Sequence, residues 1–255
     1  MIHESAIIGK NAKISSDIQV GVNCVIGDNV KIGKKCILKD NVRIVGNTTI
    51  GTGNIFFSNS VIGEIPQDKK YYGENTKLII GDGNTFREFV TINTGTLSGG
   101  GKTIIGSNNW VMSYVHIAHD CNIGNSNTFA NCTQLAGHVN VQNNSILGGF
   151  TGIHQFCTIG SYSITGISSV ILKDVFPFTK VMGNRAKLFG LNHEGIKRAE
   201  FNNLEVSDIK DTYKKFFNSS LTYDEAKQTI KNIKNSKISD IILSFIDISC
   251  KGIVR

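Results

Sequence analysis

The chain has 255 residues, enough for one large domain and a small one. Its composition is globular, with 40% hydrophobic and 18% charged residues, and no stretch reaches the roughly 18 apolar residues that a membrane-spanning helix needs. The formal net charge of +7 favours an anionic partner, whether nucleic acid, an acidic protein or a phosphorylated substrate, but does not choose among them.

The cysteines and the N-terminus indicate a cytoplasmic protein. None of the six cysteines, at positions 24, 36, 121, 132, 157 and 250, belongs to a Cys-X-X-Cys pair, which excludes zinc-ribbon and thioredoxin-like sites. We expect packed thiols in a reducing compartment rather than disulfides. The N-terminal MIHESAIIGKN lacks the basic and apolar regions of a signal peptide, so we expect the cytoplasm and no membrane span.

From residue 2, an aliphatic residue recurs every six positions. The series runs Ile2, Ile8, Ile14, Val20, Ile26, Ile32, Leu38, Ile44, Ile50, Phe56 and Ile62, resumes at Ile80, Phe86 and Ile92, and continues from Ile105 to Ile171 with Thr165 as its polar exception. Small residues form a second series four positions later. A period of six fits neither a helix nor a long strand. It predicts short strands separated by tight corners, three to each triangular coil of 18 residues.

Two segments interrupt this count, and the period stops after about residue 187. Stacked, these triangular coils form a prism, and we expect the interruptions, roughly 64–78 and 93–104, to leave it as loops. Beyond residue 187, the sequence pattern predicts helices, with a capping box at Thr222–Glu225 and further helix starts at Ser207 and Ser239. We therefore expect a parallel β-helix over 1–187 and a small α-helical domain over 188–255.

Residues 18 apart in the sequence should lie above one another in such a prism. The residues that this rule gathers on one edge, across three coils, are His119, Asp120, Gly137, His138, His154 and Gln155, with His116 near the corner. Four of the chain's six histidines fall in this column. The alternative is a set of solvated histidines on a β surface, but so many in one place favour chemistry.

Clustered histidines beside a carboxylate are typical of general-base catalysis. An imidazole can accept a hydroxyl proton near pH 7. Either Asp120 or a backbone carbonyl could orient His119, and the backbone N–H of Gly137 could meet an oxyanion above it. The same histidines could instead hold zinc, as in the γ-class carbonic anhydrases, although those chains are shorter and lack a helical tail of this type.

The glycine-rich stretch GTLSGGGKT, residues 95–103, is not a P-loop. That motif needs four residues between its Gly and its Gly-Lys, and here five residues separate Gly95 from Gly101. A hexad follows instead of a helix. We expect a flexible surface loop.

Six strings together resemble the UDP-N-acetylglucosamine 3-O-acyltransferase family of hexapeptide-repeat proteins, over the whole chain. They are GEIPQDKKYYGE (63–74), GGGKTIIGS (99–107), HIAHDC (116–121), LAGHV (135–139), GGFTGIHQFCTIG (148–160) and GNRAKLFGLNHEGIKR (183–198). The resemblance implies that the β-helix is left-handed, an exception to the usual crossover rule. It also implies transfer of an acyl chain from acyl carrier protein to the sugar 3-hydroxyl of UDP-N-acetylglucosamine, the first step of lipid A synthesis.

The resemblance also assigns roles to residues of this sequence. His119 is the implied base, Asp120 acts with it, and Gly137 offers its amide to the oxyanion. The implied substrate-binding residues are Gln67, Asp68, Lys70, His116, His138, His154, Gln155, Asn192, Glu194 and Arg198, with Ile167 near the position that limits acyl length. Ala199 stands where the family often has a second Arg, which weakens one nucleotide contact.

No cofactor or metal is implied, and the family is a homotrimer with its sites between adjacent prisms. Basic residues near the junction with the helical domain could steer the acidic carrier protein, or could simply be a solvated face. They are Lys173, Lys180, Arg185, Lys187, Lys197 and Arg198.

Other functions remain open at this point. The acceptor could carry a 3-amino group, giving an amide. The related UDP-acylglucosamine N-acyltransferase has an extra uridine-binding domain before its prism, whereas the hexads here begin at Ile2. A zinc-binding β-helix is a third possibility. Nucleic-acid binding fits the basic charge, but no recognition motif is present, and we expect no nucleic-acid partner.

Overall fold

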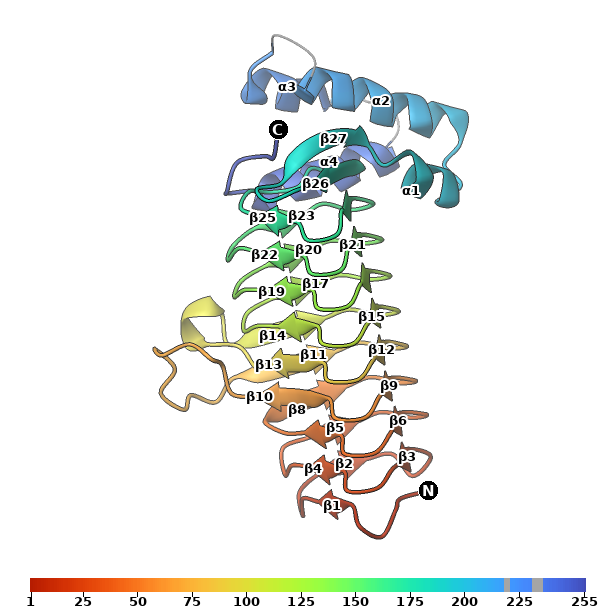
Figure 1. Ribbon diagram of the computed structural model, residues 1–255, viewed down its shortest axis with the longest axis vertical. Helices are drawn as coiled ribbons and strands as arrows, with labels where there is room; N and C mark the ends of the chain where they lie inside the picture. The colour runs from red at the N-terminus through yellow and green to blue at the C-terminus, as the bar shows by residue number, and fades with distance from the viewer. Residues whose placement is uncertain (218–220, 231–235) are drawn as a thin grey trace.

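The computed structural model describes residues 1–217, 221–230 and 236–255. In this part of the chain, three sheets, parallel except for the last strand of one of them, form the sides of a left-handed β-helix, and helices cover its C-terminal end (Figure 1). None of the described helices is long and apolar enough to cross a membrane.

Each sheet takes one short strand from each coil. The first contains β1 (Ile7–Ile8), β4 (Val25–Ile26), β7 (Arg43–Ile44), β10 (Val61–Glu64), β13 (Thr91–Asn93), β16 (His116–Ile117), β19 (Gln134–Leu135), β22 (Gly152–Ile153) and β25 (Val170–Ile171). The second contains β2 (Lys13–Ile14), β5 (Lys31–Ile32), β8 (Asn47–Ile50), β11 (Lys77–Ile80), β14 (Lys102–Ile105), β17 (Asn122–Ile123), β20 (Asn140–Val141) and β23 (Thr158–Ile159). The third contains β3 (Gln19–Val20), β6 (Ile37–Leu38), β9 (Ile55–Phe56), β12 (Thr85–Phe86), β15 (Trp110–Val111), β18 (Thr128–Phe129), β21 (Ile146–Leu147), β24 (Ile164–Thr165), β26 (Thr179–Met182) and β27 (Lys187–Leu191).

The six-residue aliphatic series forms the core of the prism. Ile8 pairs with Ile26 of the next coil, and Ile117 pairs with Leu135, so the 18-residue coil predicted from the sequence is confirmed. Side chains of the series point inward, and those from Ile26 to Ile171 are buried. The exception, Thr165, is buried too, and its hydroxyl has a partner there, the Thr151 hydroxyl at 2.9 Å.

The small residues of the second series line the corners. Asparagines of this series form a ladder in which the side chains of successive coils are joined by hydrogen bonds. Asn84 donates to Asn54 Oδ1 at 2.9 Å, and Asn109 donates to Asn84 Oδ1 at 2.9 Å. All three are buried, so their amide groups meet each other rather than water.

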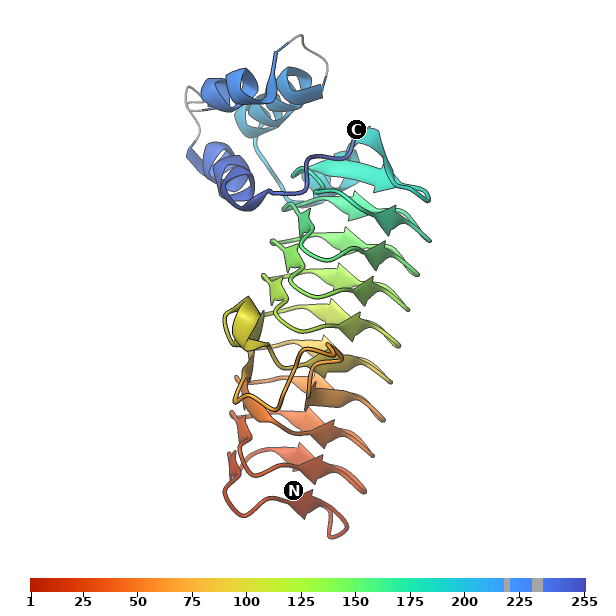
Figure 2. The ribbon, with the colours of Figure 1, turned by 90° about the vertical axis from the view of Figure 1, so that its left-hand side faces the viewer.

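Two insertions leave the prism on one side, between β10 and β11 and between β13 and β14 (Figures 1 and 2). The second insertion contains the short 3₁₀ helix η1 (Leu97–Gly99). Because β11 starts at Lys77 and β14 at Lys102, the last residues of both expected loop ranges, 64–78 and 93–104, lie in strands. Leu78 and Thr103 are therefore buried.

The described helices are α1 (His193–Arg198), α2 (Asn203–Phe217), α3 (Tyr223–Ile230) and α4 (Ser236–Ile248). β27 still pairs with β26, so the chain leaves the sheet at Asn192, a few residues after the expected domain boundary at 187/188. The capping box of Thr222 and Glu225 is confirmed by hydrogen bonds in both directions. The helix starts expected at Ser207 and Ser239 are wrong, because α2 and α4 begin at Asn203 and Ser236.

After α4, the chain returns to the end of the prism. Asp174 is buried, and its carboxylate accepts hydrogen bonds from the Ser249 hydroxyl and from the backbone N–H groups of Cys250 and Lys251. Val254 then joins the core of the prism. One buried acid thus ties the tail to the last coil.

Candidate active site

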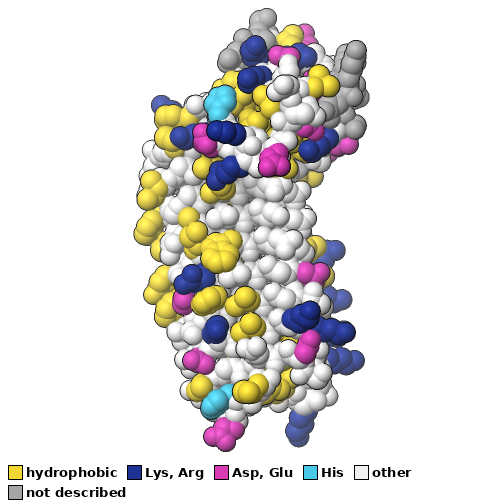
Figure 3. All heavy atoms as spheres, turned by 90° about the vertical axis from the view of Figure 1, so that its right-hand side faces the viewer, with side chains coloured by type: hydrophobic (Ala, Val, Ile, Leu, Met, Phe, Trp, Pro, Cys, Tyr) yellow, Lys and Arg dark blue, Asp and Glu magenta, His cyan; other side chains and the backbone are white. Residues whose placement is uncertain are grey.

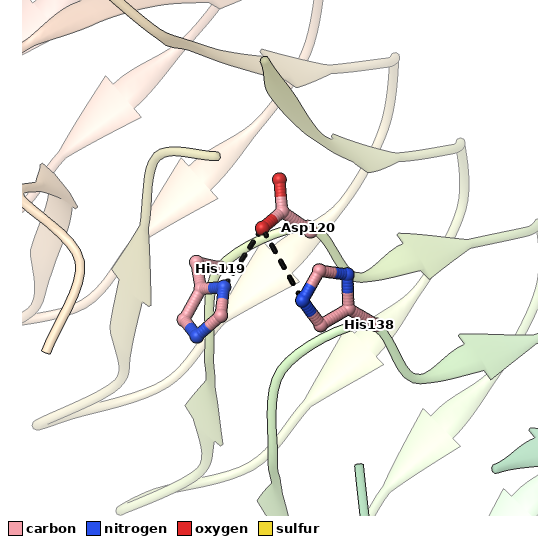
Figure 4. A group of neighbouring side chains, drawn as sticks. All are labelled: His119, Asp120 and His138. Atoms are coloured by element: carbon pink, nitrogen blue, oxygen red, sulfur yellow. Dashed lines mark hydrogen bonds and ion pairs between the residues drawn. The ribbon is translucent and has the colours of Figure 1, made fainter. Parts of the chain in front are cut away.

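The corner that follows β16 brings the candidate base and its neighbour to the surface of the prism. Asp120 has a φ of +59°, and His138, one coil later, has a φ of +61°. This left-handed turn places the side chains of His119, Asp120 and His138 together, as the sequence predicted (Figure 4).

The Asp120 carboxylate orients His119. The imidazole Nδ1 of His119 lies 2.8 Å from Asp120 Oδ2. Because a carboxylate only accepts, Nδ1 carries the proton and Nε2 keeps its lone pair. Of the two orienting groups left open by the sequence, the structure supplies Asp120 rather than a backbone carbonyl.

The Asp120 side chain is fully buried, and its oxygens meet several donors. Thr96 donates its backbone N–H to Oδ1 at 2.8 Å and its hydroxyl to Oδ2 at 2.6 Å. The backbone N–H of Asp120 donates to Thr103 Oγ1 at 2.8 Å. These contacts hold the carboxylate in one orientation toward His119.

Gly137 lies directly against the His119 ring. A Cβ at this position would be 2.7 Å from Nε2 and 2.5 Å from Cε1 of His119. Its backbone N–H donates to no acceptor among the described residues, while the N–H of His138 donates to His119 O at 3.0 Å. A side chain at residue 137 would displace the His119 ring. The Gly137 N–H, beside that ring, remains available to donate to an oxyanion.

Two further histidines flank the pair. His138 Nε2 lies 3.8 Å from Asp120 Oδ2, and its ring stacks on Phe156 with centroids 4.4 Å apart. Burial lowers the pKa of His138, against the opposing effect of Asp120. Burial also lowers the pKa of His116, and its Nδ1 lies 2.8 Å from the Thr91 hydroxyl. Both rings therefore favour the neutral form.

An open groove of about 990 Å³ runs past these rings. Its polar lining includes the predicted residues Gln67, Asp68 and Lys70 of the first insertion, together with His116, His119, His138, His154 and Gln155. Its apolar lining consists of Ala118, Leu135, Ala136, Ile153, Phe156, Val170 and Leu172. A groove lined by both polar and apolar side chains suits a substrate with a polar head and an alkyl chain.

Four of the predicted substrate-binding residues do not line this groove in the single chain. Ile167 is 72% exposed at another corner. Asn192 caps α1: its side-chain oxygen accepts from Gly195 N and its amide donates to Tyr162 O. Glu194 and Arg198 are exposed on α1, where Arg198 Nε donates to Glu194 O at 3.3 Å.

Sequence reasoning missed the contribution of the second insertion. It treated residues 95–103 as a flexible surface loop, and that interpretation is wrong for part of the stretch. Thr96 is buried on Asp120, Gly99 packs against the same carboxylate, and Ser98 lines the groove. Thr96 lies 24 residues before Asp120, which is not a whole number of 18-residue coils, and it belongs to an insertion outside the coils, so counting by 18 could not find this contact.

The same cluster could in principle offer ligands to a metal, since atoms of His119, Asp120 and His138 lie within 4.8 Å of one another. However, His119 Nδ1 and Asp120 Oδ2 are already joined by a hydrogen bond, and Thr96 contacts both carboxylate oxygens. This donor set fits a base held by a carboxylate better than a ring of metal ligands.

Two family descriptions match parts of the chain. "Bacterial transferase hexapeptide (six repeats)" matches residues 102–137, and "Udp N-acetylglucosamine O-acyltransferase; Domain 2" matches residues 174–254. The first match contains His116, His119 and Asp120 but ends just before His138, and the second contains the described helices.

Relatives match over the full length. The acyl-[acyl-carrier-protein]–UDP-N-acetylglucosamine O-acyltransferase of Herminiimonas arsenicoxydans is 44% identical, with 100% of this chain and 99% of that one covered. The protein of the same name from Verminephrobacter eiseniae is 47% identical, with the same coverage.

Solved structures show the same fold. LpxA from Acinetobacter baumannii has a TM-score of 0.95 and 42% identity, covering 100% of this chain and 99% of that one. The UDP-N-acetylglucosamine acyltransferase from Campylobacter jejuni has a TM-score of 0.92 and 36% identity, with both chains fully covered.

Proposed function

The chain belongs to the acyl-[acyl-carrier-protein]–UDP-N-acetylglucosamine O-acyltransferase family, and we propose that His119 is the general base of that reaction. The enzyme moves an acyl chain from acyl carrier protein to UDP-N-acetylglucosamine, the first step of lipid A synthesis. The observation that carries the assignment of the base is the 2.8 Å hydrogen bond between His119 Nδ1 and the buried Asp120 carboxylate, which leaves Nε2 free to take a proton.

The reaction exchanges one acyl bond for another. His119 Nε2 removes the proton of the sugar 3-hydroxyl as that oxygen attacks the thioester carbonyl. The Gly137 N–H stabilises the negative charge that develops on the carbonyl oxygen. The C–S bond then breaks, and the proton on His119 passes to the leaving thiolate of the carrier protein. A general base of this kind contributes about 10²–10⁴ in rate.

Polar and apolar side chains of the groove suit different parts of the substrates. We assign the sugar nucleotide to the polar side chains Gln67, Asp68, Lys70 and Gln155, and the acyl chain to the apolar side chains. Hydroxyl and amine acceptors need the same base, so a 3-amino UDP-sugar remains the alternative acceptor. Ile167 is assigned to the limit on acyl length only in the assembled enzyme, because it is remote from this groove in one chain.

The enzyme is proposed to act as a homotrimer in the cytoplasm. Asn192, Glu194 and Arg198 do not line the groove of their own chain, so a neighbouring prism would have to present them. Apolar side chains form a band along one edge of the face in Figure 3. The exposed, stacked rings of Phe89 and Tyr114 are of the kind that a partner covers. The cysteines are thiols, which is compatible with a reducing compartment.

Replacing His119 tests the assignment of the base. His119→Ala is expected to lower kcat about 10²- to 10⁴-fold while the chain keeps its fold and its KM values, because the proton acceptor alone is lost. The assay follows acyl transfer from acyl carrier protein to UDP-N-acetylglucosamine and to its 3-amino analogue. His3→Ala, at the exposed N-terminal end, is the matched control and should retain full turnover. Turnover near that of the unaltered enzyme in His119→Ala would contradict the assignment.

A further inference from the structure

The second insertion crosses back onto the prism and covers the Asp120 carboxylate. Thr96 is buried, and it is the residue of this insertion that contacts both oxygens of Asp120, with its N–H on Oδ1 and its hydroxyl on Oδ2. The hydroxyl contact, at 2.6 Å, is the shorter of the two. It falls on the same oxygen that accepts the proton of His119 Nδ1.

Neutral groups hold this buried acid. Among the described residues, no lysine or arginine forms an ion pair with Asp120, and its charged or chargeable neighbours are His119 and His138. A buried carboxylate needs hydrogen bonds to remain ionised, and charge-assisted bonds are the strong ones. The donors of Thr96 therefore have a direct influence on how much negative charge Oδ2 offers to His119.

The loop is shaped for this contact. A Cβ at Gly99 would overlap the Asp120 carboxylate, so only glycine allows the carboxylate to approach. The Gly99 N–H donates to Thr96 Oγ1 at 3.2 Å, and the Ser98 hydroxyl lies 3.0 Å from it. Because the one proton of the Thr96 hydroxyl is given to Asp120, both neighbours donate to Thr96. This leaves Thr96 with a single orientation.

We propose that Thr96 is a positioning residue for the reaction, which acts on His119 through Asp120 and makes the second insertion a support for the base. The inference rests on the proposed function of His119. Thr96 does not line the groove, while its neighbour Ser98 does, so the effect of Thr96 on turnover is separable from substrate contact. The loop thus contributes to the chemistry without touching the reacting atoms.

The test compares Thr96→Val with Thr96→Ser. Valine has the shape of threonine but cannot donate, so the His119–Asp120 pair loses a hydrogen bond that stabilises its negative charge and holds an added proton more tightly. We expect the acid limb of the kcat/KM profile to move to higher pH, and kcat at pH 7 to fall about 10- to 100-fold. KM for both substrates should stay within about twofold, because the groove lining is unchanged. Serine keeps the hydroxyl and should restore both the profile and kcat.

Two further variants separate this role from folding. Thr133→Val removes a buried hydroxyl that donates to the Ala130 carbonyl at 2.8 Å, and it should leave the acid limb unmoved. Gly99→Ala keeps the hydroxyl but presses on the carboxylate, and it should lower kcat even if Thr96→Val fails to fold. An unmoved acid limb with unchanged kcat in folded Thr96→Val, or full activity in Gly99→Ala, would overturn the inference. If the unaltered enzyme transferred no acyl chain to either nucleotide, the proposed function would fail instead.

Discussion

The residues around His119 are held by backbone turns and close contacts. The turn at Asp120 and the one at His138 both use left-handed backbone, so neighbouring side chains converge on one point outside the prism. The neutral preference of His116 and His138 follows from burial, whereas His119 owes its orientation to Asp120. Glycine at 137 is required for space, since the ring of the base occupies the place of its side chain.

Gly137→Ala is therefore expected to displace the base without unfolding the coil. The backbone of Gly137 is not in the left-handed region, so alanine is allowed there, but its Cβ would lie 2.5 Å from His119 Cε1. We expect about a 100-fold loss of kcat, the effect of moving a reacting group by about 1 Å. Steady-state kinetics and thermal unfolding measure the two consequences. Gly27→Ala, whose Cβ would make ordinary contacts at 3.4 Å, is the control, and equal kinetics for the two variants would disprove the steric argument.

Segments outside the regular coils position the site from both sides. The first insertion brings Gln67, Asp68 and Lys70 to the groove, and the second holds Asp120. The C-terminal tail reaches the same region from the far end of the prism. Lys251 Nζ lies 5.4 Å from the Phe156 ring, and that ring stacks on His138.

Asp174→Ala should release this tail. The substitution leaves the N–H groups of Thr158, Cys250 and Lys251 without the carboxylate that they contact. We expect a loss of at least about 3 kcal/mol in the free energy of unfolding, because buried donors lose their partners. We also expect cleavage near residue 250 in limited proteolysis. Turnover should fall less, because the released tail no longer contacts Phe156, whose ring stacks on His138. Urea unfolding gives the stability, with exposed Asp28→Ala as control. Equal stability of the two variants would show that Asp174 does not anchor the tail.

The whole molecule is a rod whose groove is open along one side. The predicted nucleotide residues Glu194 and Arg198 lie on α1, outside this groove. A second prism beside the first would close the groove and bring another copy of α1 to it. The assembly would then complete a site that one chain leaves unfinished.

Mixed oligomers test this arrangement. His119→Ala and Arg198→Ala chains are each expected to lose activity alone, but to recover up to about a quarter of it when co-expressed, because some interfaces then combine two intact faces. Light scattering should give three times the chain mass of 27.8 kDa. No recovery in a mixed trimer would mean that both residues serve the site of one chain. A monomer with full activity would exclude sites between chains altogether.

The six-residue period is a local property, and it was sufficient to predict the coils, the inward-facing series and the column of His119, Gly137 and Gln155. Each coil repeats the geometry of the one before it, so counting by 18 converts sequence distance into spatial distance. Counting fails wherever the chain departs from the coil. The contacts of Thr96 with Asp120, of Asn192 with Tyr162 and of Asp174 with the tail join residues whose separation in the sequence is not a multiple of 18. Such contacts exist because packing closes the chain on itself, and buried polar groups must find partners wherever the folded backbone places them.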